Sequence, residues 1–419
     1  MTASDVEVVV IGGGAAGIAA ARKLRAAGID ALILEARDRL GGRAWTVAAP
    51  TGFPIDLGCG WLHSADRNPW RLLAEAEGYT VDHTPPPWSR PTLPRGSPSP
   101  AHAAFGEAIG SFREKLAAFP AGEADRPASA FKKPQGRWNP LLDAVSTFYS
   151  GAELDRISAR DLSRYDDSGV NWRVVEGYGA LVAAQGAGLP VRLGCSAERI
   201  DRRGKRLRVD TAQGSIAADF VIVTLPSNLL ADNPGLFLPA LPDKAEAAAG
   251  LPLGLADKLF LSLAGAEEFE DESRTFGRMD RAATPAYHFR PFGRPEIEAY
   301  FGGELARALE VGGEAAFANF DIAELVGLFG SDFAKRVKPL AFHAWGSDPW
   351  ARGSYSYAVP GRADDHARLA MPVDGRLFFA GEACSTTDYS TAHGAYLTGE
   401  ETAGQLIAIR NRLPLSHNT

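Results

Sequence analysis

The chain has few cysteines, no excess of basic residues and no long apolar run. Its three cysteines, Cys59, Cys195 and Cys384, lie far apart in the 419-residue sequence and form no CxxC pair. This spacing excludes a zinc ribbon and a dithiol redox centre, and so sparse a count is typical of the reducing cytosol. The eight histidines show no metal-ligand spacing, so no metal site is expected.

Charge and hydropathy exclude two classes of partner. Lys and Arg number 44 against 51 Asp and Glu, a net charge of −7 that argues against nucleic acid and is compatible with cationic substrates. No apolar run approaches the roughly 20 residues of a membrane span, and residues 1–5 lack the basic start of a secretion signal. We therefore expect a cytoplasmic protein without a membrane partner.

The first forty residues predict one βαβ unit. Residues 6–11 are an apolar, β-branched run that favours a strand, and residues 12–17 form a glycine turn. Residues 15–27 favour a helix that ends near Gly28, and residues 31–35 favour a second strand.

The glycine turn has the spacing of a dinucleotide-binding loop. Gly12 permits the tight turn, Gly14 leaves room for pyrophosphate, and Gly17 lets the helix pack on the strand. The N–H groups and positive end of the following helix would hold the phosphates. Glu35 ends the second strand 18 residues after Gly17, near the roughly 20 expected for a ribose-binding acid.

The rest of the chain alternates between this strand-rich pattern and other segments. Residues 84–100 hold seven prolines and cannot form regular helix or sheet, whereas residues 191–193, 207–211 and 220–225 favour strands again. The strand-rich pattern is then interrupted a second time. After this interruption, residues 377–380 favour a strand and residues 391–410 an amphipathic helix. We expect a discontinuous nucleotide-binding domain of residues 1–80, 173–230 and 362–419, and a substrate-binding domain of residues 81–172 and 231–361.

The segment after Glu35 is either an exposed basic loop or a second part of the nucleotide site, and a family resemblance favours FAD over NAD. Residues 36–43, ARDRLGGR, place a glycine pair before an arginine, which suits a second close backbone approach and a cation facing phosphate or flavin oxygen. The segment resembles the one that follows the ribose acid in FAD enzymes of the glutathione-reductase-like superfamily. A nicotinamide-linked disulfide reductase would need a redox cysteine pair and a second glycine fingerprint, and the sequence has neither.

Five separated motifs resemble the flavin-containing amine oxidases, a family that includes monoamine oxidases, polyamine oxidases and lysine-specific histone demethylases. They stand in family order at residues 56–63, 254–258, 345–357, 379–382 and 391–395. The resemblance implies an α/β fold, with a glutathione-reductase-like, Rossmann-type FAD-binding domain and an α+β substrate-binding domain. Residues 80–172 and 268–339 match the family poorly.

The resemblance assigns cofactor-binding residues across both ends and the middle of the chain. These are Gly12, Gly14, Ala16, Gly17, Glu35, Ala36, Arg37, Gly42, Arg43, Gly58, Cys59, Gly60, Trp61, Ala197, Trp345, Trp350, Tyr355, Gly381, Glu382, Thr391 and Ala392.

Lys258 and Tyr355 are the implied catalytic residues. From its pattern alone, Lys258 lies on one face of a strand over residues 257–263, where a lysine is usually solvated. The family places this lysine beside the flavin N5, bridged to it by water. Enclosed there, it would have a depressed pKa and could exchange a proton with water. Tyr355 corresponds to one wall of the aromatic cage that holds the amine.

Two positions depart from the monoamine oxidases. Ser354 replaces the cysteine that links FAD covalently in those enzymes, so FAD should be held without a covalent bond. Thr391 replaces the second cage tyrosine, so the family's cage is at most half built here. Both departures resemble the polyamine oxidase and demethylase branch.

The C-terminal motifs carry two further expectations. Glu382 follows a buried run and needs a partner, and the family pairs it with the ribityl hydroxyls of FAD. Thr391 suits the N-cap of the last helix, whose first N–H groups, at Ala392 and His393, would face the flavin C2 carbonyl and stabilise the reduced ring.

The implied reaction is oxidation of a small polyamine or monoamine to an imine, with O₂ reduced to H₂O₂. An L-amino-acid oxidase is an alternative, with Arg290 and Arg294 as candidate carboxylate clamps. A carotenoid-desaturase-like or protoporphyrinogen-oxidase-like enzyme is another, although it would not need Lys258. Several aromatics either line the substrate pocket or fill a core: Trp88, Trp138, Phe148, Tyr149 and Trp172.

Overall fold

The computed structural model describes residues 4–89, 100–120 and 122–412, which form two compact units. Each unit combines separate segments of the chain. Unit 1 consists of Met1–Trp45, Gly179–Pro252 and Asp364–Thr419, and unit 2 of Thr46–Tyr178 and Leu253–Ala363.

Unit 1 is built on an eight-stranded sheet of order β11-β8-β9-β10-β1-β2-β7, in which β19 also pairs with β10. The central strands are parallel, and residues 8–11 of β1 are almost completely buried, as expected for a strand covered on both faces. The strands are β1 (Ser4–Ile11), β2 (Ala31–Leu34), β7 (Val191–Arg192), β8 (Ala197–Asp201), β9 (Leu207–Thr211), β10 (Gly214–Val223), β11 (Phe237–Leu238) and β19 (Leu377–Phe379).

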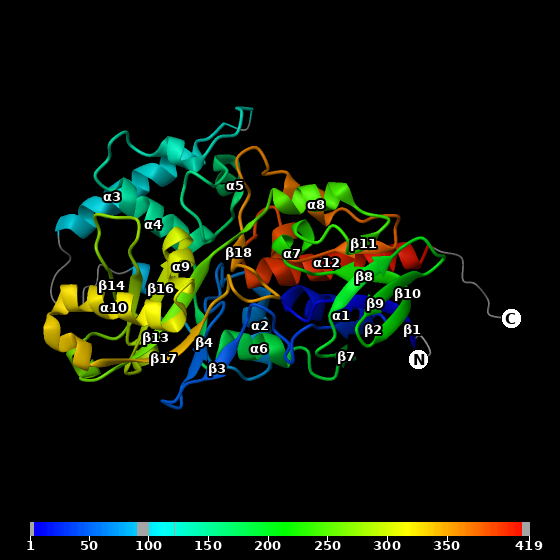
Figure 1. The fold of residues 1–419 in the computed structure, drawn as a ribbon, viewed down its shortest axis with the longest axis horizontal. Coiled ribbons are helices and arrows are strands. Elements are labelled where there is room, and N and C mark those ends of the chain that lie inside the picture. The colour runs from blue at the N-terminus through cyan, green and yellow to red at the C-terminus, as the bar shows by residue number, and fades with distance from the viewer. Residues whose placement is uncertain (1–3, 90–99, 121, 413–419) are drawn as a thin grey trace. The chain divides into compact units, whose positions relative to one another are not determined.

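Two helices of unit 1, α1 and α12, lie side by side (Figure 1). The close approach depends on Gly399 of α12, because a Cβ there would stand 2.2 Å from the carbonyl oxygen of Ala16. The helices are α1 (Ala15–Ala26), α6 (Tyr178–Ala184), α7 (Ser227–Ala231), α8 (Pro242–Ala249), α11 (Asp365–Ala370), η6 (Glu382–Cys384) and α12 (Ala392–Arg410).

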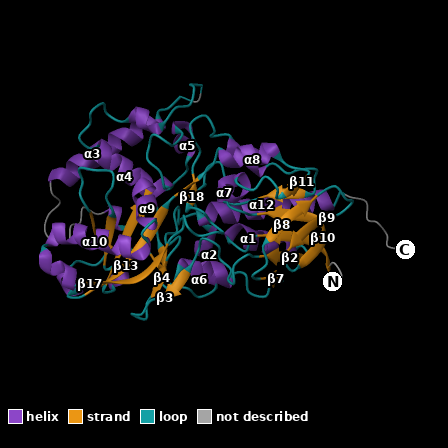
Figure 2. Cartoon of the chain, in the orientation of Figure 1, coloured by secondary structure: helices purple, strands orange, loops and turns teal. Residues whose placement is uncertain are grey.

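Unit 2 centres on an antiparallel sheet of order β14-β15-β16-β13-β17, drawn in orange in Figure 2. Its strands are β13 (Ala256–Leu263), β14 (Ser273–Phe276), β15 (Ala286–Phe289), β16 (Glu296–Gly302) and β17 (Val337–His343). Three short pairs accompany it: β3 (Thr46–Ala48) with β4 (Pro54–Asp56), β5 (Val81–Asp82) with β6 (Arg173–Val174), and β12 (Leu253–Gly254) with β18 (Tyr355–Ser356).

Helices of unit 2 pack on this sheet through aromatic side chains. The ring of Phe317 contacts Phe301 of β16 and Phe342 of β17, at centroid distances of 4.9 and 4.6 Å. The helices are α2 (Pro69–Ala76), η1 (Pro87–Ser89), α3 (Pro100–Ala117), η2 (Ala128–Phe131), α4 (Asn139–Ser150), α5 (Ala159–Arg164), η3 (Ala266–Glu268), η4 (Pro291–Gly293), α9 (Gly303–Glu310), α10 (Gly313–Phe329) and η5 (Ser331–Lys335). None of the described helices is both long and apolar enough to cross a membrane.

Most of the predicted elements are present. The predicted strands and helix of the βαβ unit are confirmed as β1, α1 and β2, and the last helix as α12. The predicted strand at residues 220–225 is the end of the longer β10. In the proline-rich segment, η1 is a single short turn, residues 90–99 lie outside the described residues, and α3 begins at Pro100.

The boundaries of the compact units differ from the expected domain boundaries. Residues 46–80 lie in unit 2, where Leu62 forms a bridge with Trp172 and the carbonyl oxygen of Pro54 accepts a hydrogen bond from Arg294. Residues 231–252 lie in unit 1, where β11 pairs with β8 and α7 packs on α8. The assignment of cofactor and substrate to separate domains stays a prediction.

Candidate active site

The carboxyl ends of four parallel strands meet at one edge of the sheet of unit 1. Gly12 follows β1, Glu35 follows β2, Thr224 follows β10, and Gly381 lies just after β19. Loops at this edge of a doubly wound sheet are where such folds bind ligands. A small cavity there is lined by residues 223–226 and 379–384, together with Arg43, Leu230 and Leu369.

The three glycines of the nucleotide loop have distinct structural roles. Gly12 has φ +107°, and a Cβ there would stand 2.5 Å from Oγ1 of Thr224. A Cβ on Gly17 would stand 2.0 Å from the carbonyl oxygen of Gly12, so helix and strand require glycine where they touch. A Cβ on Gly14 would meet no atom closer than 3.9 Å. No protein atom would clash with a side chain at Gly14. Glycine at this position therefore suits a loop that leaves space for a bound group in front of it.

The start of α1 suits an anion. The helix begins at Ala15 after Gly14, has no side-chain cap and carries no acidic residue in its first turn. Backbone N–H groups at such an end, with the positive end of the helix dipole, bind phosphate. The loop therefore fits the pyrophosphate of a dinucleotide.

Glu35 is buried beside this loop. Its Oε2 accepts a hydrogen bond from the N–H of Gly13 at 2.6 Å, and its Oε1 accepts one from the N–H of Arg37, beyond Ala36, at 2.8 Å. Each carboxylate oxygen retains a second lone pair, so the group can still accept ribose hydroxyls.

The second glycine segment packs directly on the first. The N–H of Gly41 donates to the carbonyl oxygen of Gly13 at 2.9 Å, and the Cα of Gly14 lies 3.2 Å from the position of a Cβ on Gly42. Arg43 then pairs with the buried Glu382 at 2.9 Å. The other carboxylate oxygen of Glu382 accepts the N–H of Ser390 at 2.9 Å, so this buried acid has partners within the protein, and its pairing with the ribityl hydroxyls stays a prediction.

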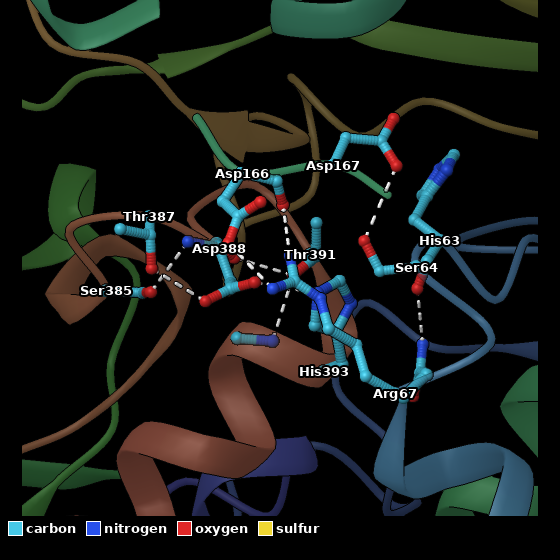
Figure 3. A network of polar contacts seen from close by, with 12 residues as sticks. His63, Ser64, Arg67, Asp166, Asp167, Ser385, Thr387, Asp388, Thr391 and His393 are labelled. Atoms are coloured by element: carbon cyan, nitrogen blue, oxygen red, sulfur yellow. Dashed lines mark hydrogen bonds and ion pairs between the residues drawn. The ribbon is translucent and has the colours of Figure 1, made fainter. Parts of the chain in front are cut away.

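Thr391 is the N-cap of α12, as the sequence predicted. Its Oγ1 accepts the N–H of Gly394 at 2.9 Å and donates to the carbonyl oxygen of Asp388 at 2.6 Å (Figure 3). His393 is buried and its Nε2 lies 3.2 Å from Oδ1 of Asp388, a structural contact. Ala392, the first residue of the helix, follows directly from this cap.

Lys258 belongs to unit 2, on β13, which pairs with β16 on one side and β17 on the other, and the lysine is buried. Its Nζ lies 2.8 Å from Oε1 of Glu298 and 3.2 Å from the carbonyl oxygen of Asp56. Burial lowers the pKa of Lys258, but the Glu298 carboxylate, together with Tyr300 and Asp56, outweighs this effect and the pKa is raised. The expected depression of this pKa was wrong, because the counter-ion stands on a neighbouring strand that the sequence could not locate.

Tyr355 is joined to a second tyrosine that the sequence analysis missed. The Tyr355 hydroxyl donates to the carbonyl oxygen of Phe148 at 2.6 Å, so the hydroxyl of Tyr300, 3.1 Å away, donates to Tyr355. Tyr300 is the register partner of Lys258 on β16, and its ring centroid is 5.8 Å from Nζ. Burial raises the pKa of Tyr355 well above its usual range, so both hydroxyls stay protonated.

The motif at residues 56–63 contacts the same lysine. A Cβ on Gly60 would stand 3.3 Å from Nζ of Lys258, so a larger residue there would press on the ammonium. The buried Trp345 donates from Nε1 to the carbonyl oxygen of Leu57 at 3.0 Å, just before Gly58 and Cys59. Trp61 packs edge-on against Trp88 at 4.5 Å.

Three further residues singled out from the sequence have the following surroundings. Trp350 is 40% exposed, and Ala197 begins β8. Ser354 is buried, and its hydroxyl donates to the carbonyl oxygen of Ala256 at 2.7 Å.

The aromatic residues expected either in the substrate pocket or in a core have different surroundings. The ring centroid of Phe148 lies 6.0 Å from that of Tyr300, and Trp138 packs against a helical core. Trp172 stacks on His83, and Tyr149 is exposed.

Both candidate carboxylate clamps are already engaged. Arg290 pairs with Asp271 at 2.8 Å and also donates to the carbonyl oxygen of Phe269. Arg294 donates to the carbonyl oxygens of Pro54 and Val175, at 2.8 and 3.0 Å. Neither guanidinium is placed as the bidentate partner that an amino-acid carboxylate would require.

Comparison with known proteins identifies the family of this chain. Residues 15–407 match the family model described as flavin containing amine oxidoreductase. Polyamine oxidase 2 of Arabidopsis thaliana is 30% identical over an alignment of 440 positions that covers 95% of this chain and 87% of the relative. A lysine-specific histone demethylase 1 homolog of the same plant is 27% identical, and the match covers 98% of this chain and 59% of that protein.

A solved structure shares the fold. It is a putrescine oxidase double mutant made in a redesign of cofactor binding, with a TM-score of 0.76 at 20% identity, and the match covers 97% of this chain and 100% of that one. The family match spans nearly the whole chain, and the loops of unit 1 fit a dinucleotide. The chain therefore belongs to the flavin containing amine oxidoreductases, FAD-dependent enzymes that oxidise amines.

Proposed function

We propose that this enzyme oxidises a C–N bond of a small polyamine or monoamine to an imine, passes the electrons to O₂ and releases H₂O₂. The observation that carries the proposal is Lys258, a buried ammonium whose register partner Tyr300 shares a hydroxyl contact with Tyr355. The names of the polyamine oxidases of Arabidopsis and rice, 28–30% identical to this chain, support a polyamine.

Residues of unit 1 would hold FAD without a covalent bond. Gly14 and the start of α1 would take the pyrophosphate, and Glu35 a ribose. Arg43, Glu382 and the start of α12 are proposed to meet the ribityl and flavin parts, as in the family. When bound, FAD supplies the redox chemistry by accepting a hydride from the carbon next to the nitrogen.

Residues of unit 2 would position the amine and manage protons. The ring of Tyr355 offers a face on which an amine can rest, and the protonated hydroxyls of Tyr300 and Tyr355 leave that face uncharged. Lys258 holds a proton on Nζ and can order a water molecule or exchange a proton with it. The imine product then hydrolyses in water.

Two finer parts of the proposal concern location and substrate. The buried free thiols of Cys195 and Cys384 support a reducing compartment, and we propose the cytoplasm. The engaged side chains of Arg290 and Arg294 favour an amine without a carboxylate over an L-amino acid.

A substrate panel tests the function. The yellow protein is mixed anaerobically with putrescine, spermidine, spermine, benzylamine and L-amino acids, and flavin absorbance is followed before air is admitted and peroxide is measured. We expect bleaching by at least one amine, then recovery of colour with peroxide equal to the amine consumed. Bleaching only by L-amino acids, or by no compound, would reject the proposal. Bleaching without peroxide would reject O₂ as acceptor.

A further inference from the structure

Lys258 stands at one end of a row of buried charged side chains in unit 2. Oε1 of Glu298 lies 2.8 Å from its Nζ, and Oε2 of Glu298 lies 3.6 Å from Nδ1 of His288. Nε2 of His288 lies 2.7 Å from Oε2 of Glu272. We call these residues and their continuation, Arg173 and Asp82, the charge row.

The far end of the charge row reaches towards solvent. Nη2 of Arg173 lies 2.6 Å from Oε1 of Glu272 and 2.8 Å from Oδ2 of Asp82, whose side chain is 17% exposed. When His288 is protonated, the form that its raised pKa favours, positive and negative side chains alternate along the row and each inner group lies between two groups of opposite charge. This alternation matters because a buried charge left without a partner is strongly destabilising.

The antiparallel register of the sheet builds the row. His288 of β15 is directly opposite Glu298 of β16, and Lys258 of β13 is opposite Tyr300, two residues along from Glu298. Directly paired and diagonal residues on one sheet face are within contact distance of each other for long side chains. Glu298 is thereby held between a lysine and a histidine.

Other polar groups near Lys258 have different roles. The carbonyl oxygen of Asp56 accepts from Nζ, and its carboxylate adds a weaker attraction. Tyr300 presents a protonated phenol, and His343, opposite Lys258 on β17, is paired with Asp348 at 2.9 Å. Glu298 therefore supplies the carboxylate that pairs with Nζ.

Resting on the proposed function, we infer that Glu298 is a positioning residue that keeps Lys258 an ammonium ion with Nζ held in place, while His288 and Glu272 hold Glu298 from behind. The directions of the pKa shifts agree with this arrangement. Against the effect of burial, the pKa of Glu298 is lowered by Lys258 and His288, and that of His288 is raised by Glu272 and Glu298. Without Glu298, burial would dominate at Lys258 and favour the neutral amine.

The test compares Glu298→Gln with the parent over pH 6–10. Two quantities are measured: the midpoint potential of bound FAD, which needs no substrate, and the rate of anaerobic flavin reduction by an amine. At each pH, the ratio of the reduction rate of the variant to that of the parent is taken. This ratio removes the effect of ionisation of the amine substrate, which is the same for both proteins. We expect the reduction rates to agree within about threefold at pH 6 and to differ by about tenfold or more at pH 9, since a pKa shift of one unit changes the charged fraction up to tenfold. The potential of the variant should fall more steeply with pH.

Two further variants make the comparison specific. Glu298→Asp keeps the carboxylate and should restore most of the parent profile. Glu296→Gln, on the same strand and bonded to Thr51 at 2.6 Å instead of to a lysine, should leave both profiles unchanged. A rate ratio and potential difference that do not change with pH would overturn the inference, as would the same change in Glu296→Gln.

A folding failure is also informative. If Glu298→Gln does not fold, the double variant Lys258→Met/Glu298→Gln removes both charges. Recovery of folded, FAD-binding protein would trace the failure to an unpaired Lys258, as inferred, and no recovery would overturn the inference. If no amine reduces the parent, the proposed function fails, and the potential measurement still decides the role of Glu298.

Discussion

The hydroxyl of Tyr300 lies 3.1 Å from that of Tyr355, which in turn donates to the carbonyl oxygen of Phe148 at 2.6 Å. These two hydrogen bonds give the hydroxyl and the ring of Tyr355 different roles. Its hydroxyl ties β18 to α4 and β16, whereas its ring is the surface proposed to receive the amine.

Two substitutions of Tyr355 should therefore give different results. Tyr355→Phe leaves a carbonyl and a phenol without their partner and should cost about 1–3 kcal/mol of unfolding free energy, with KM changed less than about threefold. Tyr355→Leu removes the ring face and should raise KM for the amine about 2- to 30-fold. Urea unfolding and steady-state kinetics measure the two effects. An equal rise of KM in both variants would show that the hydroxyl, and not the ring, binds the amine.

FAD should be released by denaturation. Ser354 stands where a covalent link would need cysteine, and its hydroxyl is bonded to the backbone of Ala256. Precipitating the holoenzyme with acid should leave all of the yellow colour in the supernatant. Flavin that remained with the pelleted protein would contradict non-covalent binding.

Glu35→Gln should weaken FAD binding and leave the fold intact. The substitution removes a charge-assisted contact worth about 1.5–3 kcal/mol in total, and it also loosens the contact with the N–H of Gly13. The dissociation constant, measured by titrating apo-protein with FAD, should rise about 10- to 150-fold. Glu401→Gln, an exposed change on α12, is the control. Equal constants for Glu35→Gln and the parent would remove Glu35 from the site.

Asp321, buried in α10, should make stability depend on pH. Burial raises its pKa to about 8, so between about pH 4 and 8 the folded chain holds a proton that the unfolded chain has lost. Its contribution to stability is therefore greatest in acid and falls as pH rises towards 8, by at most about 1.4 kcal/mol per pH unit.

Asp321→Asn should remove this slope and stabilise the protein above pH 8. Urea unfolding at pH 5, 7 and 8.5 measures it, with Glu314→Gln, an exposed change on the same helix, as the control. A slope equal to that of the parent in Asp321→Asn would assign the dependence to another group.

Features that depend on a short stretch of sequence could be predicted from the sequence alone. The order strand, glycine turn, helix, strand and acid placed Gly12, Gly17 and Glu35 correctly, because each follows from spacing along one short segment. The cap at Thr391 was predictable for the same reason. The roles of the predicted site residues stay predictions until a substitution tests them.

Features that depend on strand register were not predictable. Tyr300 and Glu298 lie in a segment with weak family resemblance, and only the pairing of β16 with β13 brings them to Lys258. The raised pKa of Lys258 follows from that pairing. Likewise, the boundaries of the units follow from contacts between distant segments, such as the bridge between Leu62 and Trp172.

The role of Lys258 in amine oxidation is tested most directly by stopped-flow absorbance of the flavin in Lys258→Met. This substitution keeps the length and apolar stem and removes the ammonium, so FAD should bind with a similar spectrum. Lys338→Met, an exposed lysine on the neighbouring strand β17, is the matched control and should resemble the parent. We predict that anaerobic reduction by an amine, or reoxidation by O₂, slows about 100-fold or more in Lys258→Met. Both half-reactions within about threefold of the parent would contradict the account.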